Sequence, residues 1–163
     1  MIAAAYRVLR RRLPVETRPG YCLAFVRQVI EHGLRLAPYT LYRLVEAHFA
    51  LRPGEVLGQD IHPRWARGAE RALRAAGLAR PQVARMEPGD LVFSHRVSRP
   101  YGHVGLLMPG GLVLENTTAN RGWRHPAMGA VRLTDRRDWD PITTVIDGER
   151  LAEALLALTE EAA

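Results

Sequence analysis

The hydrophobic pattern of this chain changes period near Pro88-Gly89-Asp90, and that change constrains the fold more than any other feature. Before this turn, apolar residues recur at helical spacing in three segments, about 22–33, 39–51 and 64–77. After it, short runs with strand character predict five strands, at 91–95, 103–108, 112–117, 130–133 and 142–146. An amphipathic segment at about 149–161 predicts a closing helix. Helices followed by strands favour an α+β fold, with N-terminal helices packed on a five-stranded antiparallel sheet.

A chain of 163 residues suits one compact domain, and no linker, repeat or low-complexity segment divides it. We therefore expect a single catalytic domain over 1–163, with its core at about 17–147 and the C-terminal helix after it. Apolar residues make up 47% of the chain and charged residues 25%, which excludes a disordered or fibrous protein.

All 23 basic residues are arginines, against 17 acidic residues, so the chain carries a net charge of +6. Such a charge favours anionic partners, namely nucleic acid, acidic cell-wall polymer or a membrane surface. No zinc-finger, aromatic-rich strand or glycine-rich phosphate motif accompanies the arginines, so no specific nucleic-acid site is predicted.

The N-terminal stretch Met1-Ile2-Ala3-Ala4-Ala5-Tyr6 is too short an apolar run for a secretory signal, and its arginines follow instead of preceding it. No segment approaches the ~20 apolar residues of a membrane span. We expect synthesis in the cytoplasm, with outside help for any export. The oligomeric state is left open.

The single cysteine, Cys22, cannot form an internal disulfide and lies where the first predicted helix begins, after Pro19-Gly20. Unpaired backbone N–H groups at a helix N-terminus favour a thiolate and can also receive an oxyanion. The alternative is a buried, inert cysteine, because unpaired cysteines are among the most buried residues.

His103 begins a strand between Gly102 and Gly105, and glycine in a strand often marks the close approach of another backbone or a ligand. This placement would let a helix N-terminus come near the imidazole. We take His103 as a candidate base for Cys22, with a purely structural histidine as the alternative. His95, at the end of the preceding predicted strand, is the rival base.

A third residue must orient the imidazole, and the next strand offers Glu115 and Asn116 on opposite faces. A two-residue turn would place Asn116 on the face of His103, but its closing pair would need an N–H that Pro109 lacks. A three-residue loop, with Pro109 in a type I turn and Gly111 as a left-handed bulge, pairs Gly105 with Glu115. This register favours Glu115, with Asn116 kept in reserve.

The motifs together resemble the NlpC and CHAP cell-wall peptidases, which belong to the papain-like superfamily of cysteine peptidases. The resemblance extends over about 17–118. It is carried by a cysteine at a helix start, a Pro-Gly-Asp turn leading into a strand, and the run Gly102-His103-Val104-Gly105. It implies a papain-like fold and a catalytic triad in which Cys22 is the nucleophile, His103 the base and Glu115 the third residue. The choice between the NlpC and CHAP branches stays open.

The resemblance also implies a function, the hydrolysis of a peptide or amide bond in bacterial peptidoglycan through a thioester at Cys22. A phage endolysin or a tail-associated wall hydrolase, acting at the wall after release or within a bacteriophage particle, fits the small size. Alternatives are a thiol acyltransferase or deconjugating peptidase with an intracellular substrate, or a catalytically silent domain that binds walls or nucleic acid.

We predict no metal and no cofactor. His62, His95 and His125 could be combined with Asp60 as ligands, but no His-x-x-x-His or cysteine spacing supports such a site.

Overall fold

The computed structural model describes residues 1–10, 14–15, 18, 21–83, 85–94, 100–116, 123–124, 131–139 and 141–160. Its helices are α1 (Ile2–Leu9), α2 (Cys22–Leu34), α3 (Thr40–His48), α4 (Ala66–Ala75) and α5 (Gly148–Glu160). Its strands are β1 (Leu91–Ser94), β2 (His103–Met108), β3 (Leu112–Asn116), β4 (Trp123–Arg124), β5 (Val131–Asp135) and β6 (Thr144–Ile146). The α+β class expected from the sequence, with helices before the strands and a C-terminal helix, is confirmed.

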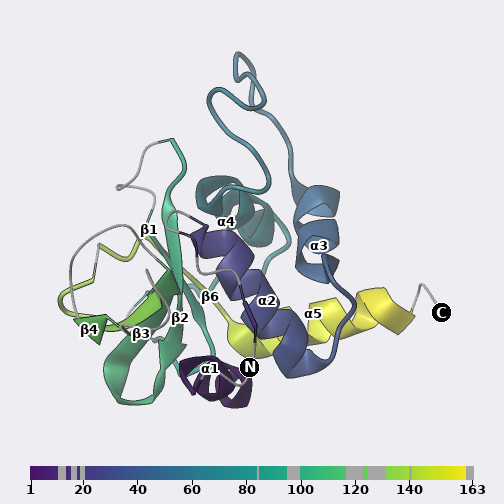
Figure 1. Cartoon of the computed structure of the whole chain (residues 1–163). Helices are drawn as coiled ribbons and strands as arrows, with labels where there is room; N and C mark the ends of the chain where they lie inside the picture. The colour runs from purple at the N-terminus through teal and green to yellow at the C-terminus, as the bar shows by residue number, and fades with distance from the viewer. Residues whose placement is uncertain are drawn as a thin grey trace.

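The described strands form one antiparallel sheet in the order β4-β5-β3-β2-β1-β6. The five strands predicted from the sequence correspond to β1, β2, β3, β5 and β6, while β4 adds a two-residue strand beside β5. Figure 1 shows the sheet on one side of the molecule, α2 running beside it, and α5 crossing below.

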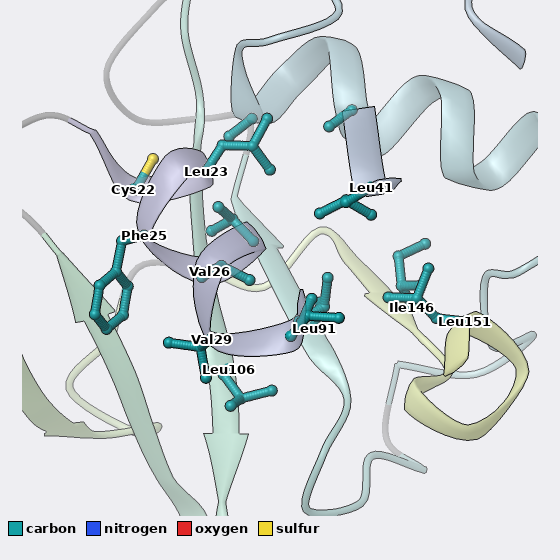
Figure 2. Close-up of a cluster of buried hydrophobic side chains, with 14 of the residues drawn as sticks. Cys22, Leu23, Phe25, Val26, Val29, Leu41, Leu91, Leu106, Ile146 and Leu151 are labelled. Atoms are coloured by element: carbon teal, nitrogen blue, oxygen red, sulfur yellow. The ribbon is translucent and has the colours of Figure 1, made fainter. Parts of the chain in front are cut away.

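The main hydrophobic core lies between α2 and the sheet. Phe25, Val26 and Val29 of α2 are fully buried, and they share one apolar cluster with Leu91 of β1 and Leu106 of β2. Figure 2 shows these side chains together, with Cys22 at the end of the helix. The stripe that the sequence predicted on this helix therefore fixes α2 against the sheet. Burial of each such side chain contributes about 1.5–3 kcal/mol.

A smaller cluster contains Val92, Leu107, Val113, Trp139 and Val145, which come from β1, β2, β3, β6 and the segment after β5. Val92 and Leu107 alternate with the neighbours that join the main core, so this cluster lies on the other face of the sheet. It thus covers the sheet face that His103, Gly105 and Leu107 share.

The turn between β2 and β3 has the predicted length and register but a different type. Met108 pairs with Leu112 and Gly105 with Glu115, so Pro109–Gly111 is a three-residue connection. Gly110 has φ 78° and ψ 11°, the conformation of position i+2 in a type II turn, and Gly111 is also left-handed. Two adjacent glycines permit this geometry, so the expected type I turn was wrong while the register held.

Two further expectations need correction. The helical spacing of 39–51 predicts that His48 shares the buried stripe of that helix as a core residue, but His48 lies exposed in the last turn of α3. Helix α1 was not predicted, although Ala4, Ala5 and Val8 are fully buried in the main core. Its short apolar face buries small residues that give a weak periodic signal.

No helix in the part of the chain that the structure describes has the length and apolar character needed to cross a membrane.

Gly68 lies where α4 meets the segment before it, and a Cβ there would sit 2.0 Å from the carbonyl oxygen of His62. Helix propensity alone predicts that Gly68→Ala raises the free energy of unfolding by up to ~1 kcal/mol. We expect it to fall instead, by about 1–3 kcal/mol, because backbone has to move. Urea denaturation followed by circular dichroism measures the sign, and a more stable variant would contradict this packing.

Candidate active site

Cys22 is the first residue of α2, and its neighbour Tyr21 is the N-cap without a side-chain hydrogen bond to the helix. The Cys22 side chain is only 7% exposed, yet it lines a cavity of about 590 Å³. The sulfur is therefore neither a surface thiol nor sealed in the core. The first-turn N–H groups of α2 are not capped by a side chain.

His103 is the first residue of β2 and is 6% exposed. The preceding Gly102 has φ 73°, and a Cβ there would lie 3.0 Å from the backbone nitrogen of Arg67. The helix that approaches this glycine is thus α4, whereas the sequence suggested the helix carrying Cys22. At Gly105 the close neighbour is the Val113 side chain of β3.

The structure brings Cys22, His103 and Glu115 together. Cys22 acts on the His103 ring through hydrogen bonding and charge, which help to raise the pKa of the imidazole. Nε2 of His103 lies 2.5 Å from Oε2 of Glu115. The pairing of Gly105 with Glu115 places the carboxylate on the imidazole's face of the sheet. The chain of contacts runs from sulfur to imidazole to carboxylate.

Asn116, the reserve candidate, has a different contact. It follows Glu115 on β3 and so projects to the opposite face, where its Nδ2 donates to the backbone carbonyl of Arg18 at 2.9 Å. This bond ties β3 to the segment that leads into Cys22.

Glu115 is held by three donors that the sequence did not single out. Nε of Arg132 donates to Oε1 at 2.8 Å, and the Thr134 hydroxyl donates to the same oxygen at 2.6 Å. Nε1 of Trp139 donates to Oε2 at 2.8 Å, while the Trp139 ring stacks on His103 with centroids 5.4 Å apart. Arg132 pairs with Glu115 across the sheet, and Thr134 lies on the same face of β5 two residues further on. The signal available in the sequence was the arginine between two apolar residues of this strand.

The charges of the buried pair stabilise each other. Burial alone would raise the pKa of Glu115, but the hydrogen bonds and charge of His103, with Thr134 and Arg132, lower it to about 2. Burial would likewise lower the pKa of His103, but hydrogen bonds and charge interactions with Cys22 and Glu115 raise it to about 10. The ring is therefore an imidazolium near neutral pH, beside the sulfur.

The cavity beside Cys22 is lined mostly by aromatic and cationic side chains. Trp65 and Tyr101 meet edge to face with centroids 4.6 Å apart. Arg27, which is paired with Glu31, lies over the rings of Tyr39 and Tyr42. The remaining arginines of the lining are Arg18 and Arg64, and no aspartate or glutamate is among the described residues that form it. Two of these arginines already have carboxylate partners, Arg27 in Glu31 and Arg64 in Glu46, so aromatic faces are the larger part of the free lining.

The other histidines considered from the sequence stand apart from this chain of contacts or outside the described residues. His62 lines the cavity, stacks against Trp65 and accepts the backbone N–H of Arg64 at Nδ1. His95 and His125 lie outside the described residues. Within the described part, no group of three or more His, Cys, Asp or Glu side chains is arranged to hold a metal ion.

No protein-family model and no curated protein matches this chain. Among solved structures, NlpC2 from Trichomonas vaginalis matches with 16% identity and a TM-score of 0.33, over 66% of this chain. The match spans 44% of that protein, so this chain covers less than half of its length. At this identity and TM-score the likeness says nothing about activity, and the chemistry of the site has to come from its own residues.

The buried pair predicts how stability depends on pH. Because its pKa is raised from 6.5 to about 10, protonated His103 stabilises the fold fully below pH 6.5, and this contribution is lost as the pH rises toward 10. Glu115, lowered from 4.5 to about 2, contributes above pH 4.5 and loses its contribution as the pH falls toward 2. Urea denaturation at a series of pH values should show that the free energy of unfolding declines toward pH 10 and toward pH 2.

In His103→Gln the alkaline decline should flatten, whereas His48→Gln, which changes an exposed histidine, should leave it unchanged. Equal alkaline slopes in His103→Gln and the wild type would contradict the assignment.

Proposed function

We propose that this chain is a cysteine peptidase or amidase that acts as one catalytic unit, with Cys22 as nucleophile, His103 as acid and base, and Glu115 as positioning residue. The observation that carries the proposal is the unbroken contact from the Cys22 sulfur through the His103 ring to Glu115, beside a cavity of about 590 Å³. A nucleophile, a base and an orienting third group in contact are what a thiol hydrolase requires.

In the first half of the reaction, the sulfur attacks the carbonyl carbon of an amide and forms a C–S bond. The carbonyl π electrons move to oxygen, and when they return the C–N bond breaks. His103 gives its proton to the leaving amine, which departs with both electrons of that bond. The product on the enzyme is a thioester at Cys22.

In the second half, neutral His103 removes a proton from water, and the hydroxide attacks the thioester carbonyl. The C–S bond breaks, the carboxylic acid leaves, and the imidazolium beside the sulfur is restored. Glu115 stays ionised throughout. Its role is to hold the ring in one orientation and to favour its charged form.

The start of α2 supports stabilisation of the oxyanion. The helix begins at Cys22 with no side-chain cap, so backbone N–H groups of its first turn are available beside the sulfur. Asn116 contributes to this geometry indirectly, because it holds the Arg18 carbonyl three residues before the N-cap.

We propose peptidoglycan as the substrate, on the resemblance of the Cys22, Pro88-Gly89-Asp90 and Gly102-His103 motifs to NlpC and CHAP enzymes. The cavity is compatible with this choice, since aromatic faces suit sugar or peptide groups and the arginines suit the carboxylates of stem peptides. A role at the cell wall, as a phage or host enzyme, belongs to the same proposal.

Wall hydrolysis gives the direct test. Purified protein should clear a suspension of bacterial walls, and Cys22→Ala should lower the rate by at least ~10³-fold because the thioester cannot form. His48→Ala, on an exposed position of α3, serves as the matched control and should keep full activity. Hydrolysis of model peptide amides without wall clearance would retain the thiol chemistry and refute the wall substrate. Activity in Cys22→Ala would refute the mechanism.

Alkylation tests the poised sulfur without any substrate. Because Cys22 is the only cysteine, mass spectrometry of the iodoacetamide product reports on that residue alone. At about pH 7 the wild type should react roughly tenfold faster than His103→Gln, since the imidazole beside the sulfur assists its attack on the reagent. Equal rates in the two proteins would mean that His103 does not activate the thiol.

A further inference from the structure

The segment 51–61, between α3 and α4, projects from the body of the molecule as a shaped loop, visible at the top of Figure 1. Three large apolar side chains on it are exposed: Leu51 by 45%, Val56 by 48% and Leu57 by 52%. Scattered exposed apolar residues are ordinary, but three within seven residues of one projecting loop form a local concentration.

The loop is held in shape by its own hydrogen bonds. Arg71 of α4 binds the Glu55 carboxylate through two nitrogens, at 2.5 and 2.6 Å. The Val56 N–H donates to Asp60, and fully buried Ile61 anchors the end of the loop. Since the backbone is fixed in this way while its apolar side chains face outward, their exposure is a feature of the folded surface.

At the base of the loop lies a concavity of about 490 Å³ lined by Arg52, Arg67, Arg71 and Arg74, together with Glu70 and Ala75. Arg71 is occupied by Glu55. The side chains of Arg67 and Arg74 make no hydrogen bond or ion pair with the described residues, and Arg52 acts on Glu55 through its charge. Three guanidinium groups therefore line one hollow and make no side-chain hydrogen bond with the residues that the structure describes.

Three carboxylates lie near this hollow, fewer than the four arginines that line it. Glu55 is paired with Arg71, and Glu70 is 4% exposed and accepts a hydrogen bond from the Thr144 hydroxyl. Asp60 accepts the backbone N–H of Val56. The arginines thus outnumber the acids around the loop, in a chain with net charge +6.

We propose that the loop 51–61 and the arginine hollow form a docking surface for an anionic lipid bilayer. Lipid phosphates would occupy the hollow, while Leu51, Val56 and Leu57 enter the boundary between headgroups and acyl chains. The arginines match the anionic headgroup layer of such a bilayer, and the exposed apolar side chains match the acyl layer beneath it. A soluble polyanion would use only the arginines, and a second copy of this chain would bring like charges together.

Membrane docking through this surface does not require the proposed hydrolase chemistry. The loop continues directly into His62 and Arg64, which line the cavity beside Cys22. Docking through the loop would therefore bring the mouth of that cavity close to the membrane surface.

Co-sedimentation with vesicles tests the proposal in the full-length protein, using Cys22→Ala to exclude any contribution from catalysis. Vesicles of phosphatidylcholine with phosphatidylglycerol should bind the protein, vesicles of phosphatidylcholine alone should not, and added salt should weaken binding. The double variant Arg67→Glu, Arg74→Glu should lower the partition coefficient at least fivefold for each arginine changed, on the order expected for a cation at the surface. The double variant Val56→Ser, Leu57→Ser should also lower it.

Arg150→Glu and Leu156→Ser are the matched controls, because both residues are exposed on α5, away from the loop in Figure 1. They should leave vesicle binding unchanged, and circular dichroism should show that every variant folds. No binding to anionic vesicles would overturn the proposal. Unchanged vesicle binding by the serine variant would also overturn the proposal. Together with complete competition by a short DNA duplex, that result would describe a site for soluble polyanions.

Discussion

The carboxylate of Glu115 is the group around which the site is arranged. A buried charge is costly unless it is paired and hydrogen-bonded, and this side chain is 1% exposed. Arg132 and Thr134 satisfy one oxygen, and Trp139 and His103 satisfy the other. With both oxygens occupied by fixed donors, the carboxylate can hold the imidazole in only one orientation. Loss of any donor would leave a buried charge short of partners, so the sheet and the site depend on the same contacts.

The other half of the site depends on helix packing. Phe25, Val26 and Val29 bury one stripe of α2 against the sheet, and this contact sets where Cys22 stands at the helix start (Figure 2). The sulfur and the imidazole are therefore positioned by separate parts of the structure, one by the hydrophobic core and the other by a buried polar network. Because close-packed cores transmit small displacements, substitutions in α2 far from the cavity would act on reactivity as well as on stability.

Much of this arrangement follows from local rules in the sequence. Helical period located α2, and the missing N–H of Pro109 selected the three-residue turn that aligns Glu115 with His103. The register survived an incorrect turn type because it depends on loop length, whereas the type depends on whether Gly110 is left-handed. The donors to Glu115 were not predicted. Arg132 and Trp139 reach it only once β5 has paired with β3, and a single sequence does not encode that long-range pairing in any local pattern.

The protonation of His103 carries the central claim, since it reports on both neighbours at once. Nitrogen NMR of the imidazole, followed as a function of pH in protein labelled at histidine, measures it directly. We expect both ring nitrogens of His103 to stay protonated well above pH 7, with a midpoint toward 10, and Glu115→Gln to move this midpoint down. A His103 ring that titrates near its ordinary pKa of 6.5, with the same midpoint in Glu115→Gln, would rule out this arrangement of the site.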